Sequence, residues 1–75
     1  MNIELQKIYM CKLKMKETIN RYIKDETIDL EDFLYTQYKD GELNKEEYIN
    51  IINDILKLEV ENHLKNVISK IEKDD

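Results

Sequence analysis

The chain contains no proline and only one glycine, Gly41, among its 75 residues. Proline and glycine are the residues that most often interrupt regular backbone structure, so long elements are favoured on both sides of Gly41. Apolar residues recur at intervals of three and four along both sides, which is the period of an amphipathic helix. These features predict an all-α fold that forms a single helical domain over residues 1–75, with a short helix between two long ones.

The apolar pattern places three helices at about residues 2–24, 29–40 and 44–73. The stripe of the first helix consists of Leu5, Ile8, Cys11, Met15, Ile19 and Tyr22. The stripe of the third consists of Ile49, Ile52, Leu56, Val60, Leu64, Val67 and Ile71. A second apolar line, which should also lie inside the domain, consists of Tyr48, Ile51, Ile55 and Leu58. The third helix is therefore expected to be continuous and to have its most buried part near its beginning.

The stretch around the glycine carries the signals of a turn between two helices. Gly41 is expected to end the second helix with a positive φ, which glycine adopts without strain. Asn44 is a candidate N-cap for the third helix, and Glu47, three residues later, completes a capping box. Leu43 and Tyr48 have the spacing of a hydrophobic staple. We therefore place a helical-hairpin corner from Gly41 to Asn44.

The same stretch also fits part of a calcium-binding EF-hand loop. With Gly41 at the sixth position of such a loop, Glu47 falls at the twelfth, where a bidentate glutamate belongs. The first and third positions are then Thr36 and Tyr38. Calcium takes six to eight oxygen ligands, and carboxylates supply the charge that offsets its dehydration. Because two neutral hydroxyls stand where acids are needed, we expect no bound metal and no cofactor.

The corner resembles the hairpin of the small bacterial domains called SHOCT, whose turn has the form Gly-x-Leu-Thr-x-Glu-Glu-Tyr. The residues that carry the resemblance are Gly41, Leu43, Asn44, Glu46, Glu47 and Tyr48. The resemblance implies a helical hairpin at this point, and we take no function from it.

The two long helices carry more apolar surface than a chain of this length is expected to cover. A continuous helix over residues 44–73 would be ~45 Å long at 1.5 Å per residue. Domains this small bury a limited share of their surface and often rely on a second subunit. We therefore expect a homodimer, or contact with another protein. The residues predicted for this interface are Tyr9, Met10, Leu13, Val60, Leu64, Val67, Ile68 and Ile71.

The charge of the chain is distributed unevenly. Residues 1–24 carry six Lys/Arg and two Asp/Glu, a net charge of +4, whereas residues 25–47 carry two lysines and nine acids, a net charge of −7. Lys7, Lys14 and Arg21 recur every seven residues on the first helix and are candidates for contact with nucleic acid. The chain as a whole has a net charge of −5, and runs of charge usually face solvent. Nucleic-acid binding is therefore kept as an alternative.

Catalytic chemistry is not indicated by the residue content. The chain has one histidine, His63, one serine, Ser69, and one cysteine, Cys11. A pair between Cys11 and His63 is conceivable if the first and third helices are antiparallel, but a cysteine on a core stripe usually behaves as a small hydrophobe. One histidine and one cysteine do not make a tetrahedral zinc site, and one glycine does not build a phosphate-binding loop. We expect a protein that is not an enzyme.

The sequence also bears on location and source. It has no apolar run long enough for a transmembrane helix, no signal-peptide pattern and a single cysteine, so we expect a cytoplasmic protein. Eleven isoleucines, eleven lysines and seven asparagines stand against one arginine and no alanine. This usage is typical of AT-rich genomes, such as those of low-GC bacteria, their phages and their plasmids.

Two classes of function follow from these observations. The first is a small helical module or inhibitor that occupies the surface of a host or cellular protein, as regulators from phages and mobile elements do, anti-CRISPR-like proteins among them. The second is a dimeric regulator that binds nucleic acid through the basic first helix.

Overall fold

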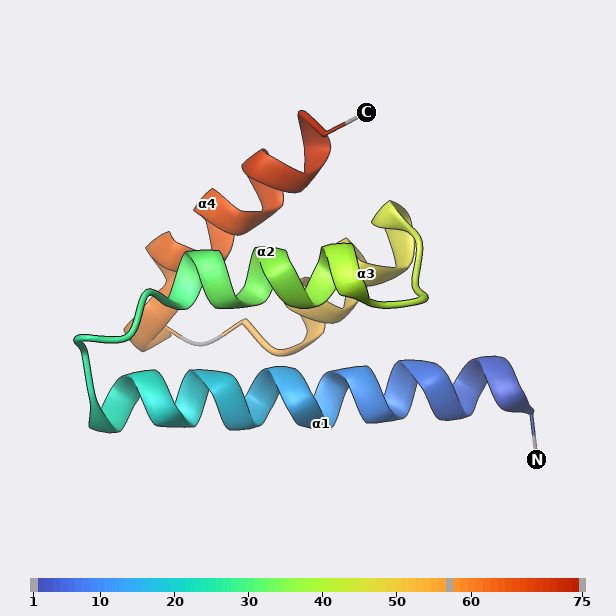
Figure 1. Ribbon diagram of the computed structural model, residues 1–75, viewed down its shortest axis with the longest axis horizontal. Helices are drawn as coiled ribbons and strands as arrows, with labels where there is room; N and C mark the ends of the chain where they lie inside the picture. Colours follow the sequence, from blue (N-terminus) through green and yellow to red (C-terminus); the bar gives the residue numbers. More distant parts are fainter. Residues whose placement is uncertain (1, 57, 75) are drawn as a thin grey trace.

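The computed structural model describes residues 2–56 and 58–74, which fold into α-helices and one 3₁₀ turn without a β-strand. The longest helix, α1, runs along one side of the molecule; α2 and α3 pack against it, and α4 packs on α2 and α3 (Figure 1). The predicted all-α fold is therefore confirmed for these residues. The elements are α1 (Ile3–Lys24), α2 (Leu30–Asp40), α3 (Lys45–Asp54), η1 (Leu58–Val60) and α4 (Glu61–Glu72).

Local capping chemistry explains where the first three helices begin. The side chain of Asn2 accepts a hydrogen bond from a backbone amide of the first turn of α1 at 2.9 Å, and that of Asp29 does the same for α2 at 3.1 Å. At α3, the Asn44 side chain accepts from the Glu47 amide at 2.8 Å, and the Glu47 carboxylate accepts from the Asn44 amide at 3.1 Å. The predicted capping box is thus confirmed, and it satisfies amides that a helix N-terminus leaves free.

Gly41 ends α2 as predicted, but the predicted positive φ is wrong. Its φ and ψ are −85° and 175°, an extended conformation that any residue adopts. A Cβ at this position would lie 2.9 Å from the backbone oxygen of Gln37. Glycine is therefore suited to this position because the backbone passes close to the last turn of α2.

The continuous third helix predicted over residues 44–73 is also wrong, because α3 ends at Asp54 and a separate helix, α4, begins at Glu61 after the 3₁₀ turn η1. A straight helix over the whole range would be ~45 Å long, which exceeds the 36 Å of the longest dimension of the molecule. The break lets α4 turn back and pack against α2 and α3. Val60 makes no side-chain capping hydrogen bond, so no local cap marks the start of α4.

The core lies where the four helices meet. Tyr48 is fully buried there, and its hydroxyl donates a 2.8 Å hydrogen bond to the backbone oxygen of Leu34. Burial, with a smaller contribution from the nearby Cys11 thiol, raises the pKa of Tyr48 and keeps the phenol neutral. Leu58, expected inside the domain, is 90% exposed on η1 because the chain has left the helix by then. The buried apolar residues are Met15, Ile19, Leu30, Leu34, Tyr48, Ile51, Ile52, Ile55, Val60, Leu64, Val67 and Ile71.

Candidate interaction surface

The residues predicted for an interface fall into two groups that the structure does not bring together. Those on α4 and η1 were expected to be open to a partner, but the protomer already buries them. Leu64 has no exposed surface, because the break before α4 folds this helix onto α2 and α3. Val60, Val67 and Ile71 are likewise buried, and Ile68 is half-buried against the same core. The expectation that these five residues face solvent is corrected: they belong to the core or to its edge.

The residues predicted on α1 do face solvent. Tyr9 is 60% exposed and Met10 58%, and Leu13 also remains open. They lie on the side of α1 away from the core-facing residues, as expected from a turn of 3.6 residues. Two further large apolar residues, Ile3 and Leu5, are exposed at the beginning of the same helix. We call the set of Ile3, Leu5, Tyr9, Met10 and Leu13 the α1 patch.

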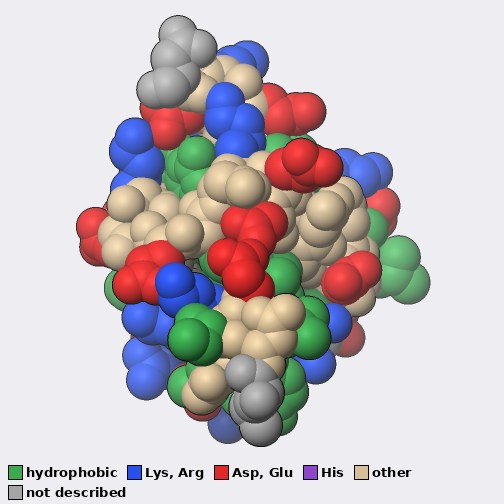
Figure 2. Space-filling model, turned by 90° about the vertical axis from the view of Figure 1, so that its right-hand side faces the viewer, with side chains coloured by type: hydrophobic (Ala, Val, Ile, Leu, Met, Phe, Trp, Pro, Cys, Tyr) green, Lys and Arg blue, Asp and Glu red, His purple; other side chains and the backbone are tan. Residues whose placement is uncertain are grey.

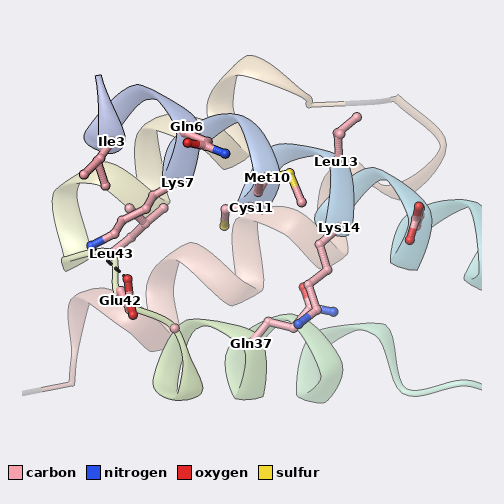
Figure 3. Close-up of a pocket in the computed structure, with 12 residues that line it drawn as sticks. Ile3, Gln6, Lys7, Met10, Cys11, Leu13, Lys14, Gln37, Glu42 and Leu43 are labelled. Carbon is pink, nitrogen blue, oxygen red and sulfur yellow. Dashed lines mark ion pairs between the residues drawn. The ribbon is translucent and has the colours of Figure 1, made fainter. Parts of the chain in front are cut away.

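A groove runs beside the α1 patch, between α1 and the end of α2 (Figure 3). Its volume is about 720 Å³, and its lining is mainly apolar. Met10 and Cys11 line it from α1, and Leu43 lines it from the turn after α2. The same end of the molecule shows hydrophobic side chains gathered over α1, with acidic side chains above them (Figure 2). We call this feature the α1–α2 groove.

Charged side chains mark the two ends of the groove. At one end, the Lys7 ammonium lies 2.8 Å from the Glu42 carboxylate (Figure 3). Their hydrogen bond and mutual attraction raise the pKa of Lys7 and lower that of Glu42. Both side chains are exposed, so this ion pair adds little to stability. Lys14 and Gln37 lie toward the other end, and the Gln37 amide donates a 2.7 Å hydrogen bond to the Thr18 hydroxyl, which joins α2 to α1.

Cys11 lies on the groove side of α1 and is half-buried. Desolvation raises the pKa of its thiol, and the positive charge of Lys14 opposes this shift more weakly. A raised pKa leaves little thiolate at neutral pH, which is the opposite of what an activated nucleophile needs. Cys11 is therefore a packing residue at the edge of the groove. A molecule bound in the groove would cover its thiol, so the rate at which the thiol reacts would report on binding there.

The three basic residues singled out for nucleic-acid contact differ in their surroundings. Lys7 is paired with Glu42, so part of its charge is already compensated. Lys14 borders the groove, and Arg21 lies in the last turn of α1. Within residues 2–56 and 58–74, neither Lys14 nor Arg21 takes part in an ion pair.

A hydrogen-bonded group that the sequence did not reveal joins α1, α2 and α4. His63 Nδ1 lies 2.7 Å from a Glu31 carboxylate oxygen, and His63 Nε2 lies 3.0 Å from the Tyr22 hydroxyl. Since a carboxylate only accepts, Nδ1 carries a proton, and in the neutral ring Nε2 accepts from Tyr22. Asn66 donates a 3.2 Å hydrogen bond to the same Glu31 oxygen. No periodic pattern could have shown this, because the partners come from three helices.

The position of His63 in this group also shows that it is far from Cys11, the residue with which the sequence could have paired it. His63 packs against Tyr22, with the two rings edge to face and their centres 5.1 Å apart. Cys11 lies three turns earlier on α1, ~16 Å away at 1.5 Å per residue. Cys11 and His63 therefore do not form a chemical unit.

Among residues 2–56 and 58–74, no three His, Cys, Asp or Glu side chains lie close enough together to hold a metal ion. The helices over these residues are too short or too polar to span a bilayer. Comparison with protein-family models, with curated proteins and with solved structures found no match to this chain.

Proposed function

We propose that this protein is a small interaction module that binds another protein through the α1 patch and the α1–α2 groove. The observation that carries the proposal is the exposure of five large apolar side chains within the first half of a single helix. Contiguous apolar patches of this kind are uncommon on monomers, and they mark sites of association. Covering them releases free energy at about 25 cal/mol for each Å² of apolar surface removed from water.

The residue types of the patch favour a protein partner. Tyrosine and methionine are enriched in the centres of protein interfaces, where charged residues are depleted. Tyr9 and Met10 stand side by side on the open face of α1. Nucleic acid, the alternative partner, would need a row of free cations, yet Lys7 already pairs with Glu42. In this proposal the protein acts as a regulator or inhibitor in the cytoplasm, by occupying a surface of its partner.

The proposal can be tested by photo-crosslinking from inside the patch. A photoreactive phenylalanine analogue replaces Tyr9 in one variant and Asn62 in a control. Asn62 is also exposed but lies at the start of α4, at the other end of the molecule (Figure 1). After irradiation in an extract of the cells that make the protein, Tyr9 should yield a discrete protein adduct and Asn62 should not. Absence of any protein adduct at Tyr9, or the same adducts from both positions, would refute the proposal.

A further inference from the structure

The α1–α2 groove has the length of a short helix. Its α1 side is lined by residues that recur every three or four positions from Ile3 to Glu17. At 1.5 Å per residue this span is ~21 Å, or about four helical turns. The other side is formed by the end of α2 and the turn after it, through Gln37, Gly41 and Leu43 (Figure 3). The groove therefore follows one face of α1 over the first half of that helix.

A second helix fits a groove of this shape. Side chains three and four residues apart form ridges along a helix, and the side chains of another helix pack between these ridges. A helix also satisfies its own backbone hydrogen bonds, so apolar side chains alone can hold it. An extended peptide would instead need the open edge of a sheet, and the described residues contain no β-strand. A bilayer is flat and does not enter a groove.

The charges that line the groove cancel. Lys7 and Lys14 contribute two positive charges, and Glu17 and Glu42 contribute two negative ones. Lys7 and Glu42 already form an ion pair at one end. Lys14 and Glu17 are three residues apart on α1, so they are neighbours on its surface. A strongly acidic or basic segment would gain no net attraction from this lining, and it would lose water from its own charges on entering.

The lining between these charges is mainly apolar. Met10 and Leu13 contribute to it from α1, and Leu43 contributes from the turn after α2. Methionine is unbranched and flexible, so it adapts to the shape of the side chains that pack on it. An occupant that places its own apolar side chains here, at the spacing of one helical face, would remove both sets from water.

We infer that the α1–α2 groove holds a helix of the partner protein, and that the contact face of this helix is apolar and uncharged over about four turns. This inference rests on the proposed function, because it names the part of the partner that enters the groove. Nucleic acid and strongly charged segments are thereby excluded as occupants of the groove.

Disulfide exchange at Cys11 tests the inference with synthetic peptides. Cys11 lines the groove, so a peptide joined to its sulfur is held there (Figure 3). Each peptide has about fourteen residues, which matches the length of the groove, and one central cysteine that forms a disulfide with glutathione. The Cys11 thiolate attacks the sulfur of the peptide cysteine, and glutathione leaves as its thiolate. The equilibrium constant of this exchange measures how well the peptide fits.

Four peptides separate shape from charge. In the first, leucines three and four residues on either side of the cysteine form one apolar face, with alanine and glutamine elsewhere. The second has the same composition, but its leucines are distributed around the helix. The third and fourth repeat the first with glutamate or lysine in place of the glutamines that flank the apolar face. Exchange is measured at about 0.15 M salt, which screens the net charge of the chain beyond ~8 Å.

The first peptide should exchange with the folded chain about tenfold more favourably than each of the others, because only its leucines are buried together without a charge beside them. In guanidinium, where the groove is lost, all four should exchange equally. Met10→Lys places a cation in the apolar lining and should shift the preference toward the glutamate peptide. Since Met10 is 58% exposed, this variant should fold, which circular dichroism verifies.

A matched control moves the thiol away from the groove. The double change Cys11→Ser and Ser69→Cys places the only cysteine at an exposed position on α4. This variant should form disulfides with the four peptides without a preference among them. The same preference at residue 69 as at Cys11 would show that the groove is not its source, and the inference would be overturned.

Two further results would overturn the inference. Equal exchange of the first and second peptides would show that the groove does not select one face of a helix. A preference of the parent chain for the glutamate or the lysine peptide would show that its occupant is charged. If Tyr9 still crosslinks to a protein in either case, the proposed function stands and only the nature of the occupant is wrong.

Discussion

The burial of α4 predicts that two identical substitutions, Leu64→Ala and Leu58→Ala, have very different effects on stability. Leu64 has no exposed surface, whereas Leu58 is 90% exposed. Truncating Leu64 removes the buried carbons beyond Cβ, a loss of ~2.4 kcal/mol at about 0.8 kcal/mol for each carbon. The cavity left behind adds to this loss, so the free energy of unfolding should fall by about 3–4 kcal/mol.

That loss is a large share of the total free energy of unfolding, which is roughly 4–11 kcal/mol for a chain of this length. The melting temperature of Leu64→Ala should fall by about 12–30 °C. Leu58→Ala should stay within about 0.5 kcal/mol of the parent, as a change on the open surface does.

Chemical denaturation followed by circular dichroism measures both values. The series is run at one protein concentration well below that needed for self-association, so that dimerisation does not contribute. A loss below about 1 kcal/mol at Leu64 would show that α4 does not pack in the core, and the structural reasoning would then be wrong. Equal losses at both positions would contradict the fold of residues 58–72.

Three further predictions concern the core, the corner and the groove. Tyr48→Phe should lower the free energy of unfolding by about 1 kcal/mol, because it removes the buried hydrogen bond to the Leu34 oxygen; urea denaturation that matches the parent would show that this bond is absent. Gly41→Val should lower the free energy of unfolding by about 1–2 kcal/mol, because the new Cβ would lie 2.9 Å from the backbone oxygen of Gln37. An unchanged melting temperature would mean that the backbone at Gly41 does not pass this close to the last turn of α2. Alkylation of Cys11 by iodoacetamide should be slow at pH 8, because burial raises the pKa of the thiol and only the thiolate reacts. The alkylation rate should increase with pH, and the midpoint of this increase should lie at a higher pH in the folded chain than in the chain unfolded in guanidinium. Equal midpoints in the folded and unfolded chain would show that the thiol is solvated.

The sequence by itself determined where α1, α2 and α3 begin. The capping side chains Asn2, Asp29 and Asn44 accept hydrogen bonds from amides two or three residues away, so all the atoms involved are close together in the sequence. The end of α2 at Gly41 was predicted for the same reason, although glycine is needed there for space and not for its φ. Tyr9 and Met10 were singled out because they fall off the core stripe, and both are exposed.

Only the tertiary structure decided where the third helix is interrupted and which apolar residues are open to a partner. Residues 55–60 contain no proline, glycine or capping side chain, so an isolated chain has no local reason to leave the helix there. Interrupting a helix forgoes backbone hydrogen bonds, and that cost is offset when Leu64 and Val67 pack against α2 and α3. The periodic pattern shows that these side chains are apolar. It does not show whether they are buried by other helices of the same chain or by another protein.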